Sequence, residues 1–470
     1  MSANFRLPDG GIIDRDEKLH FTFNGRSLAG YRGDTLASAL LANGVHQVAT
    51  SIKYGRPRGV MAAGAEEANA LVQIEEPFPE PMLPATTVEL YDGLAADGLS
   101  GQGRLADEPD PARYDAKHVH CDVLIVGAGP AGLIAALSAA RSGARVVLID
   151  DQNQAGGSLL GTDEYFDLRP SAAWVSEVVS ELRNTPGVRV LERTTAFGAY
   201  DDGFVLALQR RTDHLGAAAP ETVARQRIWR IRAKQTVIAT GAHERPVVFA
   251  GNDRPGIMLA GAARTYLHRY GVLPGRRVVV FTTNDSAYTA AIELAEAGVD
   301  VPVLVDARAV PPSGLAAECA ARGIEVRAGH VVTGTEGDER ITDAHIAPLT
   351  DGATGPTDTV ICDALLVSGG WNPVVHLFSQ VGGTLRYAPE VGAFVPGEEL
   401  STVRVAGSAT GAPDLTTCAR QGREAGRTAA IATGFNAGAE VPLPVSDARL
   451  EETAAAVLWR VPDGEEPRGV

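Results

Sequence analysis

Three glycines and one aspartate have the spacing of a dinucleotide-binding turn. The segment reads Cys121-Asp-Val-Leu-Ile-Val-Gly-Ala-Gly-Pro-Ala-Gly132, and the next apolar run ends at Asp150. Gly127 permits a tight turn, Gly129 lets backbone N–H groups approach a pyrophosphate, and Gly132 permits close helix–strand packing. The Asp150 carboxylate can then accept hydrogen bonds from ribose hydroxyls. The spacing predicts a strand, a glycine turn, a helix and a second strand that together bind a dinucleotide.

Two further positions bear on which dinucleotide is bound. A carboxylate at the ribose accepts from free hydroxyls and repels a 2′-phosphate, so Asp150 disfavours NADP. Flavin reductases of the two-dinucleotide fold end with a Gly-Asp pair whose carboxylate contacts the ribityl-phosphate region of the flavin. The corresponding position here is Gly407-Ser408. The missing carboxylate favours NAD over FAD.

A second strand–helix–strand pattern follows Gly271. It comprises a strand at 277–281, a helix to about residue 297 and a strand at 301–306. The turn between its first strand and its helix contains no glycine, and Asp285 would place negative charge near bound phosphates. We therefore expect an inserted second Rossmann unit that does not bind a dinucleotide.

The remaining elements complete an α/β architecture around these two units. Near the N-terminus a hairpin is expected around Asn24-Gly25, and a helix from Asp34 as N-cap to Gly44 as C-cap. A hairpin that leads into a capped helix indicates a β-grasp domain. Strands at 363–373 and 403–408 are expected to return to the first sheet, before a helix that begins near residue 415. The predicted domains are a β-grasp at 1–105, a linker at 106–120, the first Rossmann unit at 121–270 and 356–440, the second at 271–355, and a tail at 441–470.

Length, composition and net charge exclude several classes of protein. The chain has 470 residues, 45% of them hydrophobic, and a formal net charge of −16. This length suggests roughly three domains. The negative charge argues against general binding of nucleic acid or anionic membranes. The N-terminal residues have no pattern of a targeting signal, and no apolar run has transmembrane length, so we expect a cytoplasmic location.

The four cysteines are widely separated. They are Cys121, Cys319, Cys362 and Cys418, and no two form a CxxC pair. This excludes a disulfide framework and the dithiol of disulfide reductases, and it removes the usual thiolate sets for zinc or an iron–sulfur cluster. We interpret all four as buried, unreactive thiols and expect no metal site.

Three longer segments carry a family resemblance. They are Ala239-Thr-Gly-Ala-His-Glu-Arg-Pro and its continuation to Arg264, Ser368-Gly-Gly-Trp-Asn-Pro373, and Lys53-Tyr-Gly-Arg-Pro-Arg-Gly59. Together they resemble the α subunit of heterotetrameric sarcosine oxidase. Subunits of opine oxidases, hydrogen cyanide synthase and dye-linked amino acid dehydrogenases are the next nearest match. Those relatives carry ligand cysteines in the loop that here spans residues 60–72 without a cysteine. The resemblance therefore implies a clusterless, ferredoxin-like β-grasp domain.

The resemblance also implies a set of cofactors. It places NAD in the first Rossmann unit of this chain, FMN at the interface with a β subunit, FAD within that β subunit, and no iron–sulfur cluster in this chain. The residues expected to contact NAD are Gly127, Gly129, Ala131, Gly132, Asp150, Asp151, Gln152, Ser158 and Ala196, with Thr410, Leu415 and Thr417 closing the site from the far end of the chain.

The implied activity is oxidative demethylation of a secondary amine such as sarcosine. Hydride passes to FAD in the partner, electrons pass to FMN, and oxygen is reduced to hydrogen peroxide. This chain would supply no residue to the amine chemistry and would be inactive alone. The expected partners are the flavin-bearing β subunit and further small subunits. Family members continue into an aminomethyltransferase-like domain that binds folate, so we expect that half to be a separate polypeptide or unused.

Three alternatives stay open. The chain could be the FAD-containing α subunit of a related amino acid or opine dehydrogenase, an autonomous FAD- or NAD-dependent reductase, or a nucleotide-stabilised scaffold without a redox role. The missing glycines in the second turn count against a reductase, because hydride transfer between nucleotides needs two competent sites.

No general acid, base or nucleophile stands out from the sequence. We interpret His243 as a structural histidine and expect Glu244 and Arg245 to pair with each other. Trp371 is either a core aromatic or a residue that stacks on a nucleotide ring. The basic residues Lys53, Arg56 and Arg58 are interpreted as a solvated loop, with an FMN phosphate or an acidic partner surface as the alternative.

Overall fold

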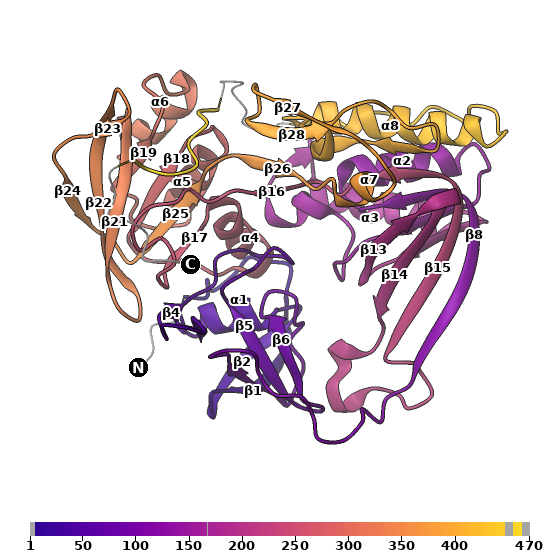
Figure 1. Ribbon diagram of the computed structural model, residues 1–470, viewed down its shortest axis with the longest axis horizontal. Helices are drawn as coiled ribbons and strands as arrows, with labels where there is room; N and C mark the ends of the chain where they lie inside the picture. The colour runs from indigo at the N-terminus through magenta and orange to yellow at the C-terminus, as the bar shows by residue number, and fades with distance from the viewer. Residues whose placement is uncertain (1–4, 167, 447–454, 463–470) are drawn as a thin grey trace.

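The computed structural model describes residues 5–166, 168–446 and 455–462. Figure 1 shows a small N-terminal domain beneath two larger units, each built around its own sheet. The first unit lies on the right of that view and carries a long yellow helix along its top. The second unit lies on the left and ends in an orange antiparallel sheet.

The N-terminal domain is a β-grasp fold, as predicted. Its five-stranded sheet has the order β2-β1-β7-β5-β6, with β1 antiparallel to β2 and parallel to β7. Asn24 and Gly25 both have positive φ, 49° and 71°, which suits a two-residue hairpin turn. Its elements are β1 Asp14–Phe23, β2 Arg26–Arg32, α1 Leu36–Ala42, β3 Ala49–Thr50, β4 Pro57–Arg58, β5 Leu71–Glu76, β6 Glu80–Pro84 and β7 Leu94–Gly98.

The cap of helix α1 differs from the prediction. Thr35, not Asp34, is the N-cap, and it forms a capping box with Ser38. The Asp34 carboxylate instead accepts from the Ser38 hydroxyl at 2.7 Å and forms an ion pair with Arg6 at 2.6 Å. The aspartate therefore ties the helix to the N-terminal segment rather than to its own first turn.

The first Rossmann unit is a seven-stranded sheet. Its path is β12-β9-β8-β15-β14-β13, and β29 pairs in parallel with β15. Residues 114–120, which we assigned to a linker, form the first half of β8, because they pair in parallel with the start of β15. The elements are β8 Tyr114–Val126, α2 Pro130–Ala140, β9 Val146–Ile149, β10 Tyr165–Phe166, β11 Arg169–Pro170, α3 Ser171–Asn184, β12 Val188–Leu191, β13 Thr194–Tyr200, β14 Phe204–Arg210, β15 Gln226–Ile238, β29 Val403–Val405 and α8 Leu415–Ala432.

The second unit contains more of the chain than we predicted. The strand at residues 364–368 does not return to the first sheet, because it lies between β17 and β18 in a parallel sheet of order β17-β25-β18-β19-β20. The elements are β17 Ile257–Leu259, α4 Ala260–Tyr270, β18 Val278–Thr282, α5 Ser286–Glu296, β19 Val303–Asp306, α6 Ser313–Ala321, β20 Glu325–Ala328, β21 His330–Gly337, β22 Ile341–Thr350, β23 Ala353–Thr354, β24 Asp358–Ile361 and β25 Ala364–Ser368.

A short pair of strands links the two units. Strand β16 (Ala242–Glu244) is antiparallel to β26 (Trp371–Pro373). The chain then forms α7 (His376–Gln380), β27 (Leu385–Ala388) and β28 (Ala393–Pro396) before β29 rejoins the first sheet. Of the two strands expected to return to the first sheet, only the second one does so.

Helices α2 and α8 pack closely on one face of the first sheet. A Cβ at Gly422 would lie 2.2 Å from the Ala131 carbonyl oxygen, and one at Gly426 would lie 2.2 Å from that of Ala135. The two backbones can approach this closely only because α8 has glycine at both positions. Helix α8, expected from about residue 415, therefore covers the helix that follows the glycine turn.

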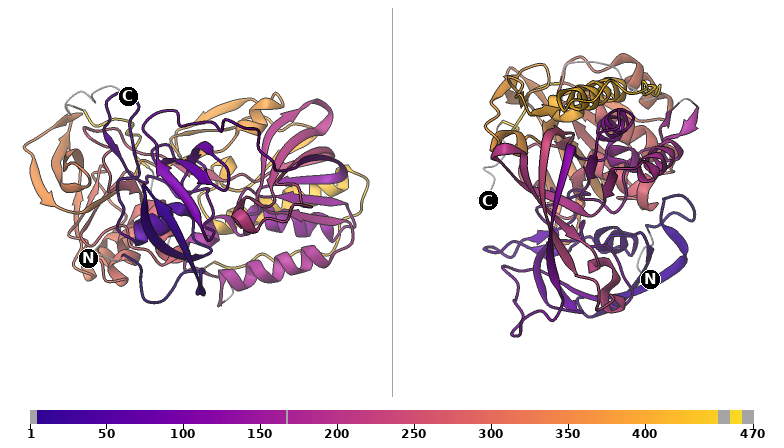
Figure 2. Two further views of the ribbon diagram at one scale, coloured as in Figure 1. Left: turned by 90° about the horizontal axis from the view of Figure 1, so that it is seen from below. Right: turned by 90° about the vertical axis from the view of Figure 1, so that its right-hand side faces the viewer.

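The N-terminal domain and the second unit share one hydrophobic core. Tyr266 of α4 is buried and donates its hydroxyl to the Ala62 carbonyl oxygen at 2.9 Å. Arg6 donates to the Tyr270 carbonyl oxygen at 2.7 Å. The right-hand view of Figure 2 shows the indigo domain directly beneath the other two units. The N-terminal domain is thus held against α4.

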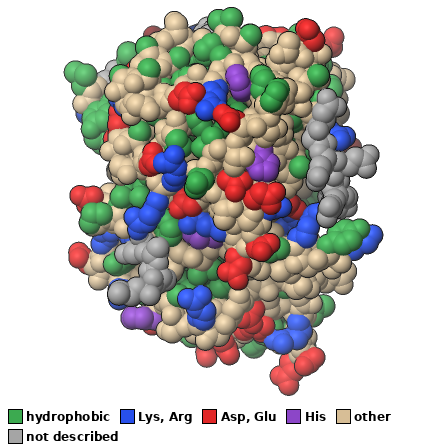
Figure 3. All heavy atoms as spheres, turned by 90° about the vertical axis from the view of Figure 1, so that its left-hand side faces the viewer, with side chains coloured by type: hydrophobic (Ala, Val, Ile, Leu, Met, Phe, Trp, Pro, Cys, Tyr) green, Lys and Arg blue, Asp and Glu red, His purple; other side chains and the backbone are tan. Residues whose placement is uncertain are grey.

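Charged side chains and cysteines are distributed as we expected from the sequence. Figure 3 shows acidic and basic side chains interspersed on the face that carries the second unit. All four cysteines are buried and free of disulfides. Burial raises the pKa of Cys121 to about 12 and that of Cys319 to about 11, so both are thiols near neutral pH.

Candidate functional site

The glycine turn has the geometry that its spacing predicts. Gly127 has φ of 102°, and a Cβ there would lie 2.3 Å from the Ala239 carbonyl oxygen. Gly129 is the N-cap of α2, and a Cβ at Gly132 would lie 1.8 Å from the Gly127 carbonyl oxygen. The first-turn N–H groups of α2 have no intrahelical acceptors, so they are available to a pyrophosphate.

Asp150 lies at the edge of this turn, at the end of β9. Its Oδ2 accepts from the Ala128 N–H at 2.6 Å, and its Oδ1 accepts from the Gln152 N–H at 2.9 Å. Burial raises the pKa of Asp150 above the ordinary range, and the neighbouring Asp151 carboxylate raises it further. Burial also raises the pKa of Asp151. Two carboxylates thus lie at the position where a ribose would present hydroxyl donors.

The structure brings the far end of the chain to the same turn. A Cβ at Gly407 would lie 2.8 Å from the Ala131 Cβ. The Thr410 hydroxyl interacts with the Gln421 side-chain oxygen at 3.0 Å, and that oxygen also accepts from the Gly407 N–H at 2.9 Å. Residues nearly 300 positions apart in the sequence therefore form one wall.

One backbone N–H group in the first turn of α8 already has a hydrogen-bond acceptor within the chain. Asp414 is its N-cap and accepts from the Thr417 N–H at 2.7 Å. Leu415 packs against the core formed by α2 and α3. Leu415 and Thr417 therefore lie in the first turn of α8, where the Thr417 N–H is used for capping.

Ser158 and Ala196 occupy two other sides of the crevice. Ser158 is exposed in the turn Gly157–Gly161, and a Cβ at Gly157 would lie 2.7 Å from the Gly129 Cα. Ala196 is half-buried on β13, two residues beyond Thr194, whose N–H donates to the Asp150 carbonyl oxygen at 2.6 Å. Both segments therefore border the predicted nucleotide site.

A set of polar residues from three domains lies beside Gln152 at the edge of the predicted nucleotide site, and sequence reasoning missed it. Glu89 of the N-terminal domain binds Arg193 through two contacts of 2.6 and 2.7 Å, and it accepts from Asn153 at 3.0 Å. Arg269 of the second unit donates to Asn153 at 2.7 Å and also to the Gln152 side chain. The Gln152 side chain is thus engaged by protein. No local motif marks these residues, because the contacts span more than 60 positions.

The turn of the second unit is filled by its own side chains. Arg308 donates to Asp285 at 2.7 Å and to Asp306 at 2.8 Å, and all three are buried. Asn284 donates to the Ser368 hydroxyl at 2.9 Å and accepts from the Ser286 hydroxyl at 2.6 Å. The negative charge of Asp285, which we expected to face phosphates, is therefore compensated by an arginine.

Glu244 and Arg245 do not pair with each other, contrary to our expectation. Successive residues of a strand point to opposite faces. Glu244 accepts from the Gly261 N–H at the start of α4 at 2.6 Å. Arg245 donates to the Gly369 carbonyl oxygen at 2.6 Å and to Asn372 at 2.6 Å. Burial raises the pKa of Glu244 to about 7.

The structure also places the other side chains that we named from the sequence. His243 is exposed on β16. Trp371 is 39% exposed and donates to the Ser286 hydroxyl at 3.1 Å. Lys53 is exposed, whereas Arg56 and Arg58 both form ion pairs with Asp253.

Comparison with known proteins places this site in a class. Residues 121–422 match the family model described as pyridine nucleotide-disulphide oxidoreductase. This match covers more than half of the chain, and the chain belongs to that family. The two Rossmann units and the glycine turn agree with this class.

Individual relatives define the family more narrowly than the family model does. The chain is 47% identical over 475 residues to the sarcosine oxidase subunit alpha of Corynebacterium sp. strain P-1, covering 98% of this chain and 48% of that protein. It is 40% identical over 513 residues to the sarcosine oxidase subunit alpha of Rhizobium meliloti strain 1021, covering 98% and 50%. The chain spans about half the length of the curated relatives it matches. The resemblance inferred from the motifs is confirmed.

A solved structure supports the same fold. The L-proline dehydrogenase of P. horikoshii superposes with a TM-score of 0.69 at 24% sequence identity, covering 93% of this chain and 77% of that one. At this identity the likeness concerns the fold alone. It agrees with the two-dinucleotide architecture that we predicted.

One prediction about cofactors is contradicted. Residues 16–100 match the family model described as 2Fe-2S iron-sulfur cluster binding domain. The N-terminal domain is thus similar to cluster-binding domains, and the prediction that this chain holds no iron–sulfur cluster is wrong as stated. We based it on cysteine positions, and the fold of a domain is specified mainly by its pattern of buried residues.

No helix in the described part of the chain is both long and apolar enough to cross a membrane.

Proposed function

We propose that this chain is the dinucleotide-holding α-type component of a sarcosine oxidase-like complex. The complex would oxidatively demethylate a secondary amine and produce hydrogen peroxide, with its flavins in or at a partner subunit. The observation that carries this proposal is the 47% identity to a sarcosine oxidase subunit alpha over 98% of this chain. The glycine turn beside a buried carboxylate supports it.

The first Rossmann unit would hold an adenine dinucleotide. Backbone N–H groups at Gly129, Ala131 and Gly132 would bind the pyrophosphate, and Asp150 with Asp151 would accept from the ribose hydroxyls. Gln152, Ser158 and Ala196 would border the adenosine. Thr410, Leu415 and Thr417 would close the crevice from the side of α8.

The preferred dinucleotide in this proposal is NAD. Ser408 stands where flavin reductases of this fold have an aspartate, and its side chain has no negative charge to offer a ribityl chain. Bound NAD would supply an adenine nucleotide that stabilises the chain, while the protein contributes hydrogen bonds and shape. No residue of this chain would take part in amine oxidation.

The purified complex tests the identity of the nucleotide. Nucleotide released by denaturation is identified by mass spectrometry, and the Asp150→Asn variant is compared with the wild type. We expect NAD in the wild type and at least tenfold less in the variant. FAD in this site of the separately purified chain would contradict the NAD assignment and favour the opine oxidase-like alternative.

Activity assays test the role of the chain. The chain alone should oxidise neither sarcosine nor NADH, whereas the complex should oxidise sarcosine. Sarcosine oxidation by the isolated chain would contradict the proposal. NADH oxidation by a flavin-bound chain would instead identify an autonomous reductase. A Gly129→Val variant that loses subunit assembly but retains its residual chemistry would favour a scaffold.

A further inference from the structure

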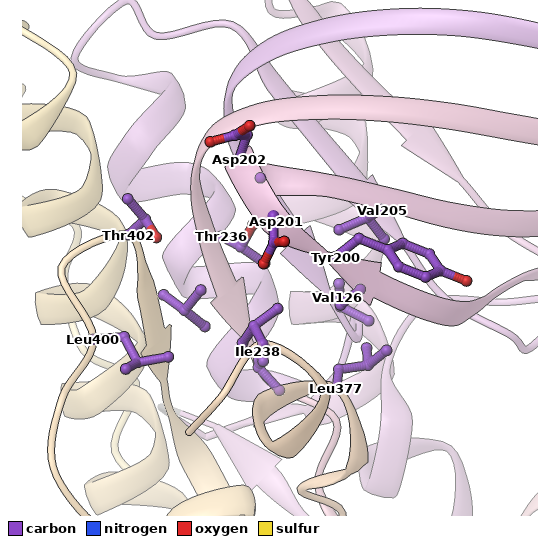
Figure 4. Close-up of a pocket in the computed structure, with 14 residues that line it drawn as sticks. Val126, Tyr200, Asp201, Asp202, Val205, Thr236, Ile238, Leu377, Leu400 and Thr402 are labelled. Atoms are coloured by element: carbon purple, nitrogen blue, oxygen red, sulfur yellow. The ribbon is translucent and has the colours of Figure 1, made fainter. Parts of the chain in front are cut away.

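A cavity lies on the other face of the first sheet, away from the nucleotide crevice. Its volume is about 190 Å³. Val126 and Ile238 of the sheet point into the core shared with Leu377 and Val403, whereas Ile125 and Val237 point toward α2. The cavity therefore lies between the sheet, the end of the β13–β14 hairpin and α7, behind the glycine turn. Figure 4 shows its lining side chains.

Aliphatic and polar side chains both line the cavity. Aliphatic side chains from five segments surround the space, and none of the lining residues is basic. An apolar guest of moderate size gains roughly 25 cal/mol per Å² of surface that it removes from water. The aliphatic lining residues are Val126, Ala199, Val205, Ile238, Leu377, Val381, Leu400 and Val403.

The polar side chains that line the cavity are those of Tyr200, Asp201, Asp202, Thr236 and Thr402. Thr236 is only 6% exposed, and its hydroxyl has no hydrogen-bond partner among the described residues. Figure 4 shows it beside Asp201 on the cavity wall. Asp201 and Asp202 are exposed at the mouth, and neither forms an ion pair within the described ranges. A buried hydroxyl and two carboxylates thus line one space, and Arg232 lies next to its mouth, where its guanidinium donates to the Asp202 carbonyl oxygen at 3.3 Å.

The mouth is held in a fixed shape. Asp202 has φ of 56°, an uncommon conformation for a residue with a side chain. Gly203 follows with φ of 66°, and a Cβ there would lie 2.0 Å from the Ala233 carbonyl oxygen. Positive φ is what the tight turn between the antiparallel strands β13 and β14 requires. The two carboxylates are therefore presented by a turn that has little freedom to withdraw.

From this geometry we propose that the cavity binds a small amphipathic amine as its ammonium cation. The ammonium group donates hydrogen bonds to Asp201 and Asp202, and the apolar body fills the space between Val205 and Leu377. Thr236 accepts or donates one further hydrogen bond inside. An amino acid fits poorly, because inside the cavity its carboxylate would meet two carboxylates and no basic lining residue. The site is thus distinct from one for a zwitterionic substrate.

Calorimetry on the purified full-length chain tests this inference with cyclohexylammonium as the probe. Cyclohexanol and cyclohexanecarboxylate have the same ring with neutral and negative head groups. We expect saturable binding of the amine, at least tenfold weaker binding of cyclohexanol, and no binding of the carboxylate. No binding of the amine, or equal affinity for the alcohol, would overturn the proposal.

Variants separate this cavity from general attraction to an acidic protein. The double variant Asp201→Asn/Asp202→Asn should weaken amine binding at least tenfold. Val205→Phe, which fills the space, should abolish it. Asp107→Asn removes an exposed carboxylate elsewhere and should leave the affinity unchanged. Unchanged amine binding in both cavity variants would refute the site. The double variant alters only exposed side chains, so it remains informative if Val205→Phe does not fold.

Discussion

Glu89 and Arg193 form a two-contact ion pair, with N···O distances of 2.6 and 2.7 Å, between the N-terminal domain and the first Rossmann unit. Their side chains are only 17% and 24% exposed. Glu89 also holds Asn153, which in turn binds Arg269 of the second unit. One carboxylate of the β-grasp domain thus connects residues of the N-terminal domain and of both Rossmann units at the edge of the predicted nucleotide site.

Replacing this carboxylate should therefore destabilise the domain arrangement. We expect Glu89→Gln to lower the free energy of unfolding by about 1–3 kcal/mol, because the Arg193 guanidinium loses its charged partner while it stays half-buried. Urea denaturation measures the change. As a control, Glu17→Gln removes an exposed pair with Arg32 and should cost less than about 0.5 kcal/mol. Equal effects of the two substitutions would contradict the special role of Glu89.

The glycine turn offers a second prediction. Gly132→Ala places a Cβ about where the Gly127 carbonyl oxygen lies, since the built position is 1.8 Å from that atom. The backbone of the turn must shift, so we expect a loss of several kcal/mol in stability and of dinucleotide retention. Melting temperature and bound nucleotide are measured together. Gly334→Ala meets no atom closer than 3.6 Å and serves as the matched control. Full nucleotide retention in Gly132→Ala would show that the turn is not the binding element.

The raised pKa of the buried Glu244 carboxyl group predicts a specific pH dependence of stability. Burial raises its pKa from an ordinary value near 4.5 to about 7 in the folded chain. Between these values the folded state holds a proton that the unfolded state releases, so the Glu244 contribution to stability falls as pH rises from 4.5 to 7. Linkage limits this loss to about 3 kcal/mol.

The Glu244→Gln variant removes this titration. We expect its stability to equal that of the wild type near pH 5 and to exceed it near pH 8, as measured by urea denaturation at both values. Glu108→Gln, at an exposed position, should follow the wild type throughout. Parallel curves for Glu244→Gln and the wild type would disprove the shifted pKa.

Glu67 gives a prediction for the N-terminal domain. Its carboxylate is 4% exposed and accepts four backbone N–H groups, from Met61, Ala62, Asn69 and Ala70, at 2.6 to 2.9 Å. In Glu67→Gln an amide NH₂ must face two of these donors, so we expect a loss of about 2–4 kcal/mol. Hydrogen exchange of the 61–70 segment should accelerate. Its exposed neighbour serves as the control, and Glu66→Gln should leave that exchange unchanged.

The local motifs were reliable where one segment contains the whole physical cause. The glycines of the first turn, the hairpin at Asn24-Gly25 and the helix from Leu415 each depend on backbone conformations that a few neighbouring residues set. The same locality explains why the missing cysteines misled us about the N-terminal domain, since its family likeness extends over the whole of residues 16–100.

By itself, the sequence determined that a tight glycine turn follows a buried strand and that a carboxylate ends the next strand. Only the tertiary structure decided that residues 364–368 pair in the second sheet and that Glu89 reaches Arg193. It also separated Glu244 from Arg245. The geometry of a turn or a helix cap depends on the φ and ψ angles of a few neighbouring residues. Strand order and the pairing of buried charges instead depend on which segments, distant in the sequence, pack against each other and exclude water.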